Sequence, residues 1–97
     1  MADKLTVVAR IKAKDGMAEQ VKQELAALIA PTRAEPDCIT YVLHQSPEDP
    51  HLFLFFESWT SKDALDAHLQ KPHLQAFIAK ADDLLAEPLD VTLWNEV

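Results

Sequence analysis

The segment ESWTSKDALDAHLQKPH, residues 57–73, brings together side chains that could carry out chemistry. His68 lies on the apolar stripe of an amphipathic pattern, and a buried imidazole stays neutral and can act as a general base. Glu57 interrupts one apolar face of a strand, where it could sit at a rim, form an ion pair or orient a histidine. Trp59 could wall a pocket for a planar ligand, with its N–H as a donor.

Each of these residues also has a purely structural interpretation. His68 could be a core histidine bound to a backbone carbonyl, which is the favoured interpretation of an isolated histidine on such a stripe. Trp59 could be an ordinary core residue. His73, directly after Pro72, could cap the following helix and face solvent, or it could contact the rim of a site. The local sequence therefore leaves both kinds of interpretation open.

Other kinds of site have weaker support. The histidines, His44, His51, His68 and His73, include no pair at i, i+4 and accompany no cysteine pair, so we expect no metal site. Cys38 has nothing in its local sequence to activate it as a nucleophile, and we expect it to be a small buried residue. A single glycine cannot build a phosphate-binding loop or a dinucleotide-binding fingerprint, so we expect no dinucleotide cofactor bound through a Rossmann site.

The composition indicates a globular protein. The 97 residues suit a single domain, residues 1–97, and a hydrophobic fraction of 48% excludes disorder. The net charge of −7 argues against nucleic acid and anionic membranes as partners, since both require clustered Lys and Arg. The longest apolar run, around residues 52–56, is too short to span a bilayer, and the start MADKL has no signal-peptide pattern. A lone cysteine fits a reducing, cytoplasmic environment.

Hydrophobic periodicity predicts the elements that must position these residues. Alternation predicts strands over residues 5–14, 38–45, 51–59 and 89–96. Spacings of three and four predict three helices: one over residues 17–32, one that begins after a cap at Thr60 or Ser61, and one over residues 74–85. The short loop at 46–50 makes the second and third strands an antiparallel hairpin. The order predicts an α+β, ferredoxin-like split βαβ fold, with a four-stranded antiparallel sheet and helices on one face.

The third strand is apolar on both faces. Phe53, Phe55, Glu57 and Trp59 point one way, and Leu52, Leu54 and Phe56 point the other. Because the helices cover only one face of such a sheet, the second face needs another cover. A second copy of the sheet is the simplest cover, so we expect a homodimer in which two sheets pack face to face.

Four stretches carry a family resemblance: VVARIKAKDG, TRAEPDCITYVLHQSPEDP, FFESWTSKDALDAHLQKPHLQAF and AKADDLLAEPLDVTLWNEV. Together they span nearly the whole chain, and the third is the densest, with an E-x-W, A-L, H and P-H pattern. The chain resembles the antibiotic biosynthesis monooxygenase (ABM) family, and within it the small quinol monooxygenase-like proteins. The resemblance implies a dimeric α+β barrel with a pocket between sheet and helices. It also implies oxygenation of phenols or hydroquinones by O₂ without metal or flavin.

The resemblance also implies roles for individual residues. His68 would be the catalytic base or the hydrogen-bond partner of the phenol oxygen, Trp59 would wall the substrate ring, and Glu57 would orient a partner or pair across the dimer. The other candidate pocket residues are Tyr41, Phe53, Phe55, His73 and Phe77, of which Tyr41 could also donate to the substrate. A deprotonated hydroquinone can itself reduce O₂, so the protein needs only an apolar pocket, a base and a donor.

Two alternatives stay open. The autoinducer-2 phosphate isomerase is similar through the H…P-H segment, with Tyr in place of Trp59, and implies proton shuttling by His68 and His73. A phosphosugar would favour a basic pocket, for which the candidates are Arg10, Lys12, Arg33 and Lys80. The chain could also be a non-catalytic dimeric binder of an aromatic metabolite. Haem degradation is not expected, because Ala9 and Ile78 stand where the haem-degrading branch has its Asn and its haem-ligand His.

Overall fold

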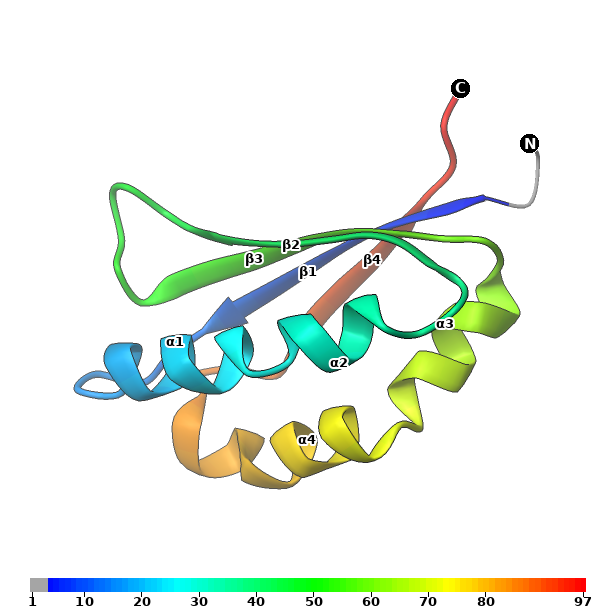
Figure 1. Ribbon diagram of the computed structural model, residues 1–97. Helices are drawn as coiled ribbons and strands as arrows, with labels where there is room; N and C mark the ends of the chain where they lie inside the picture. Colours follow the sequence, from blue (N-terminus) through cyan, green and yellow to red (C-terminus); the bar gives the residue numbers. More distant parts are fainter. Residues whose placement is uncertain (1–3) are drawn as a thin grey trace.

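The computed structural model describes residues 4–97; Met1–Asp3, part of the segment in which no signal peptide is expected, lie outside the described residues. The elements follow in the order β1 (Leu5–Lys12), α1 (Ala18–Ala26), α2 (Ile29–Arg33), β2 (Cys38–Gln45), β3 (Leu52–Trp59), α3 (Lys62–Leu69), α4 (Pro72–Leu84) and β4 (Asp90–Trp94). Figure 1 shows the strands as one layer and the helices as a second layer on one side of it. None of the helices within residues 4–97 has the length and apolar character needed to cross a membrane.

The sheet confirms the predicted α+β, ferredoxin-like fold. Its strand order is β2-β3-β1-β4, and each neighbouring pair is antiparallel. β2 and β3 form the predicted hairpin, and β2 has the predicted bounds. β1 ends at Lys12 and β4 covers Asp90–Trp94, so both strands are shorter than the sequence predicts.

The helix predicted over residues 17–32 is divided in the structure into α1 and α2, so this prediction is wrong in its continuity. Pro31 gives the physical reason, because it has no N–H to donate to the carbonyl of Ala27 and its ring crowds that carbonyl. The chain bends at Ala27 and Leu28, where the Leu28 N–H donates to the Leu25 carbonyl at 3.1 Å. The short second helix then leads into the loop that carries Glu35.

The starts of α3 and α4 fix the positions of two histidines. The Ser61 hydroxyl caps α3 by accepting a hydrogen bond from the Ala64 N–H at 3.1 Å, as one of the two predicted caps. Pro72 occupies the beginning of α4. A backbone N–H at that position has no intrahelical partner, so proline, which lacks the N–H, costs the helix no hydrogen bond there. His68 therefore lies in the last turn of α3, and His73 lies in the first turn of α4, beyond the break.

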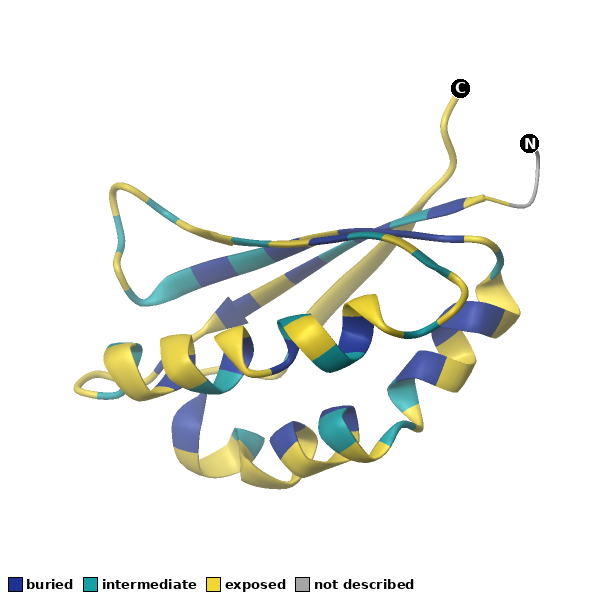
Figure 2. Ribbon diagram, in the orientation of Figure 1, coloured by how far each residue is buried: buried dark blue, intermediate teal, exposed yellow. Residues whose placement is uncertain are grey.

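One face of the sheet forms the core with the helices. Val7, Tyr41 and Glu57 are register neighbours on β1, β2 and β3, and all three side chains are buried. Trp59, at the end of β3, is completely buried at 0% exposure. Figure 2 shows the buried positions of α1 to α4 turned toward the sheet. The space between these two layers is where a site can be enclosed.

The opposite face of the sheet carries apolar side chains that no described element covers. Phe56 is 42% exposed, and its register partners on the neighbouring strands are Val8 and Val42. On the same face Trp94 of β4 opposes Thr6 and is 57% exposed. The predicted two-faced character of β3 is confirmed, because Phe55 is buried among the helices and Phe56 is not.

Candidate active site

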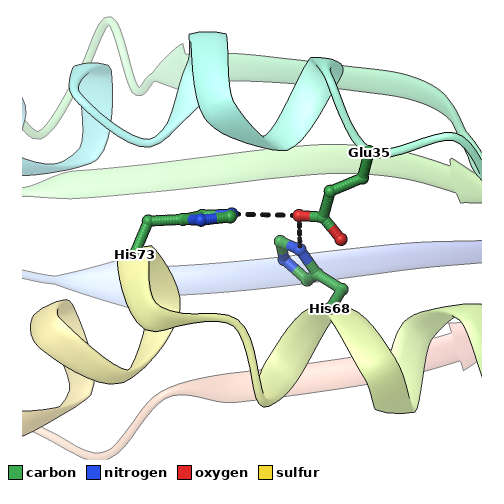
Figure 3. A group of neighbouring side chains, drawn as sticks. All are labelled: Glu35, His68 and His73. Atoms are coloured by element: carbon green, nitrogen blue, oxygen red, sulfur yellow. Dashed lines mark hydrogen bonds and ion pairs between the residues drawn. The ribbon is translucent and has the colours of Figure 1, made fainter.

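Three side chains from different segments meet at one carboxylate oxygen (Figure 3). Glu35 comes from the loop between α2 and β2, and its Oε2 accepts a hydrogen bond from His68 Nδ1 at 2.7 Å. The same oxygen accepts a hydrogen bond from His73 Nε2 at 2.9 Å. The break at Pro72 turns the two rings toward one point, although five residues separate them in the sequence. We call these three residues the Glu35 cluster.

Exposure rises along the Glu35 cluster from the core to the surface. The His68 side chain is 2% exposed, Glu35 is 8% and His73 is 21%. Burial lowers the pKa of His68, because an imidazolium loses its hydration there, and the Glu35 hydrogen bond and charge act in the opposite direction. Within residues 4–97 the two histidines are the basic groups that lie within ion-pair distance of Glu35. The site therefore holds a carboxylate and a base that burial keeps neutral.

A cavity of about 50 Å³ lies between the sheet and the helices, with His68 in its wall. The polar side chains that line it are Tyr41, Glu57 and His68, and the apolar ones are Val7, Ala9, Ile11, Leu25, Leu28, Phe55, Leu65, Leu69, Leu74, Phe77, Leu89 and Val91. A cavity that binds benzene in another protein measures about 150 Å³, so an aromatic ring fits here only if the walls move. Val91, on the exposed strand β4, is one of these lining residues although its side chain is 42% exposed.

Tyr41 presents a phenol to this cavity. Its ring stacks on Phe55 with centroids 4.3 Å apart and meets the His68 ring edge-on at 5.6 Å. Burial, followed by the nearby Glu57 charge, raises the pKa of Tyr41 well above its usual range. The phenol therefore keeps its proton at neutral pH, and it can donate a hydrogen bond to an oxygen in the cavity.

Glu57 and Trp59 form a second buried pair beside the Glu35 cluster. The Trp59 Nε1–H donates to Glu57 Oε1 at 2.8 Å, so the indole N–H is engaged within the protein. Burial raises the pKa of Glu57 to about 7, partly offset by the Trp59 hydrogen bond, while the Glu35 charge raises it further. The Trp59 ring lies 4.5 Å from the His68 ring, centroid to centroid, and supports that ring from one side.

The structure brings most of the predicted site residues together. Tyr41, Phe55, Glu57, His68 and Phe77 all line the cavity. Phe53, Trp59 and His73 are not among its lining residues: Trp59 lies behind His68, and His73 reaches the site through Glu35. Glu35 was missed, because nothing in its local sequence distinguishes it from a surface loop residue next to Pro36. The signal that could have found it is its place in the TRAEP motif of the family resemblance.

The Glu35 cluster also has the donor types of a metal site. Its ligand atoms, two imidazole nitrogens and a carboxylate oxygen, lie within 4.8 Å of one another. Such donors suit Zn²⁺ or Fe²⁺. Each nitrogen, however, already donates directly to Glu35 Oε2, so a cation would have to replace both hydrogen bonds. The contacts seen are those of a hydrogen-bonded cluster.

The fold and this site define a small α+β domain with a base and a hydrogen-bond donor in an apolar cavity between its two layers. The sequence model of one family, described as antibiotic biosynthesis monooxygenase, matches residues 4–80. The chain belongs to the antibiotic biosynthesis monooxygenase family.

The chain is also similar to individual proteins over most of its length. The chain is 36% identical to "Uncharacterized protein sll1783" from Synechocystis over 96% of its own length, and it spans 63% of that protein. It is also 36% identical to "Putative monooxygenase Rv0793" from Mycobacterium tuberculosis, over 96% of this chain and 91% of the relative. The crystal structure of PA3566 from Pseudomonas aeruginosa matches with a TM-score of 0.94 and 37% identity, covering 100% of this chain and 97% of the other.

Proposed function

We propose that this protein is a cofactor-independent monooxygenase that acts on a hydroquinone or a related phenol with O₂. The observation that carries the proposal is the position of His68, a buried neutral base in the wall of an apolar cavity, next to the Tyr41 phenol. The monooxygenase name of the Mycobacterium tuberculosis relative supports the reaction class. The hydroquinone is our inference from the residues and the resemblance.

In the proposed reaction the substrate supplies all the electrons. His68 accepts the proton of a substrate hydroxyl, and the resulting phenolate reduces O₂. One oxygen atom forms a bond to a ring carbon and the other leaves as water, so hydroquinone and O₂ give hydroxyquinone and water in equal amounts. Tyr41 donates to the developing oxyanion, in a cavity where low polarity strengthens that hydrogen bond. Glu57 and Phe55 line the same space.

The experiment that tests this function follows O₂ consumption with menadiol, a naphthohydroquinone. We expect uptake above the rate of autoxidation, and its loss in His68→Gln. His44→Gln is the matched control, since His44 is exposed on β2 and does not line the cavity. Equal uptake with and without protein would contradict the proposal and favour a non-catalytic binder of aromatic molecules.

The isomerase alternative has one observation for it and one against. Two histidines that share a carboxylate oxygen could shuttle protons, as an isomerase requires. The residues that line the cavity include no Lys or Arg among those the structure describes, so a phosphate group would find no cation there. Turnover of a phosphorylated linear ketose would be the result that reverses this ranking.

We also propose that the protein is a single-domain, cytoplasmic homodimer whose sheets pack against each other. The support for the dimer is the apolar surface on the face opposite the helices, formed by the exposed side chains of Val42, Phe56 and Trp94 and the partly exposed side chains of Val8 and Leu54. A second copy presents the same surface, and two such sheets can pack face to face. The cytoplasmic location rests on the lone Cys38.

A further inference from the structure

The Glu35 carboxylate has an unusual set of partners for a buried group. It is 8% exposed, and its Oε2 accepts hydrogen bonds from two imidazole N–H groups, at 2.7 and 2.9 Å. Buried carboxylates in proteins are normally paired with cations or held by several donors. Here the donors are histidines on two different helices, and one of them, His68, lines the cavity. This arrangement has a chemical consequence for the His68 ring.

The hydrogen bond to Glu35 determines which nitrogen of His68 carries the proton. A carboxylate oxygen only accepts, so Nδ1 must be the protonated nitrogen when it lies 2.7 Å from Oε2. In the neutral ring Nε2 then has a free lone pair. Nε2 makes no hydrogen bond to any residue within 4–97, so it is the nitrogen available to a ligand in the cavity. A ring in the opposite tautomer would have no lone pair to offer there.

The same carboxylate stabilises the charge that forms when His68 accepts a proton. An imidazolium at this depth has lost most of its hydration, and Glu35 is the one acidic group bonded to the ring within the described residues. His73 then has a positioning role. Its N–H donates to Oε2 from the surface side and keeps the carboxylate from rotating away from His68.

We propose that Glu35 is the positioning residue of this site: it fixes His68 as the Nδ1–H tautomer with Nε2 toward the cavity, and His73 holds Glu35 in place. The 2.7 Å contact between His68 Nδ1 and Glu35 Oε2 is enough to assign the tautomer, and the role of that tautomer in catalysis rests on the proposed function. The step that it serves is the transfer of one proton from a substrate O–H to His68 Nε2. That step leaves a phenolate in the cavity and an imidazolium paired with Glu35.

The direct test is the ¹⁵N–¹H correlation spectrum of the histidine side chains in the whole protein. At a pH where His68 is neutral, we expect a protonated Nδ1 and an unprotonated Nε2. Glu35→Gln should lower the pKa of His68, since the neighbouring negative charge is lost, whereas Glu87→Gln on an exposed loop should not. An Nε2–H tautomer in the native protein, or an unchanged His68 titration in Glu35→Gln, would overturn the proposal. The spectrum of the native protein tests the tautomer of His68 even if Glu35→Gln does not fold.

Activity provides the second readout. With menadiol, Glu35→Gln should lower kcat by about 100-fold or more with little change in KM, because a base held in the wrong tautomer loses most of its effect. Formate added to Glu35→Ala should restore part of the rate by replacing the carboxylate. A native rate that Glu35→Gln leaves intact would overturn this inference but not the proposed oxygenase. A native protein without turnover would refute the oxygenase, and the tautomer would still be read from the spectrum. Binding of added Zn²⁺ to both histidine rings would instead show a metal site.

Discussion

Tyr41 on β2 and Glu57 on β3 are register partners, and their side chains line the same cavity from neighbouring strands. This pairing places a phenol beside a carboxyl group in an apolar space. Burial and the Glu57 charge both raise the pKa of Tyr41. Burial also raises the pKa of Glu57, to about 7, and this has a measurable effect on folding.

Glu57 should make the free energy of unfolding depend on pH. Its pKa rises from 4.5 to about 7 on folding, so the folded state binds more protons and stability falls as pH increases between these values. Glu57→Gln keeps an oxygen for the Trp59 N–H and removes the titration. We expect it to stabilise the protein at pH 8 by on the order of 1–3 kcal/mol and to have little effect near pH 4. Urea denaturation at both pH values checks this, with the exposed Glu48→Gln as control. Equal stability of Glu57→Gln and the native protein at pH 8 would contradict it.

Activity should fall on the acidic side of the pH profile. Burial lowers the pKa of His68, so the base becomes protonated and inactive only below its ordinary value of 6.5. We expect kcat to decline with a midpoint below that pH. Because Glu57 titrates near pH 7, the profile should be recorded in both native protein and Glu57→Gln. The acidic decline should persist in the variant, and a profile with no acidic decline down to the pH at which the protein unfolds would exclude His68 as the base.

Tyr41→Phe should slow the reaction without disturbing the fold. The substitution removes the hydroxyl and keeps the ring that stacks on Phe55 at 4.3 Å. Loss of one oxyanion donor costs roughly 100-fold in kcat in enzymes that depend on it. Steady-state kinetics with menadiol measure the change, and circular dichroism confirms the fold. An unchanged kcat would assign the oxyanion contact to another group.

Phe56→Asp should dissociate the homodimer. Phe56 lies on the sheet face away from the helices, so a carboxylate there would be buried without a partner between two sheets. Ile78→Asp on α4 is a matched control, because Ile78 is 39% exposed and Phe56 is 42% exposed, on different faces of the molecule. Light scattering should give a dimer for the native chain and for Ile78→Asp, and a monomer near 10.9 kDa for Phe56→Asp. A native monomer at micromolar concentration would end the dimer proposal.

Local pattern was enough to predict the sheet and the hairpin, because strand alternation and turn residues act over a few positions. The alternation of β3 also identified which of its side chains face the helices. Pro31 shows where the same reasoning failed. Its effect falls four residues earlier, at Ala27, so the apolar spacing continues through a break in the backbone.

The candidate site was only partly predictable, for a different reason. His68 was identified from its own helix, but its partners Glu35 and Tyr41 come from other segments and meet it only in the folded chain. The spacing of His68 and His73 argued against a metal site on a shared helix face, yet the break at Pro72 brings both rings to one oxygen. Contacts across a helix break or between distant segments do not produce a periodic pattern in the sequence, so periodicity cannot predict them.

The most direct test of the central claim is the fate of ¹⁸O₂ in single turnovers with menadiol. A monooxygenase places one labelled atom in the quinone product and releases the other as water, so mass spectrometry should show a hydroxyquinone two mass units heavier. His68→Gln should abolish this product. Formation of unlabelled menadione with an equal amount of hydrogen peroxide, at the same rate in both proteins, would contradict the account.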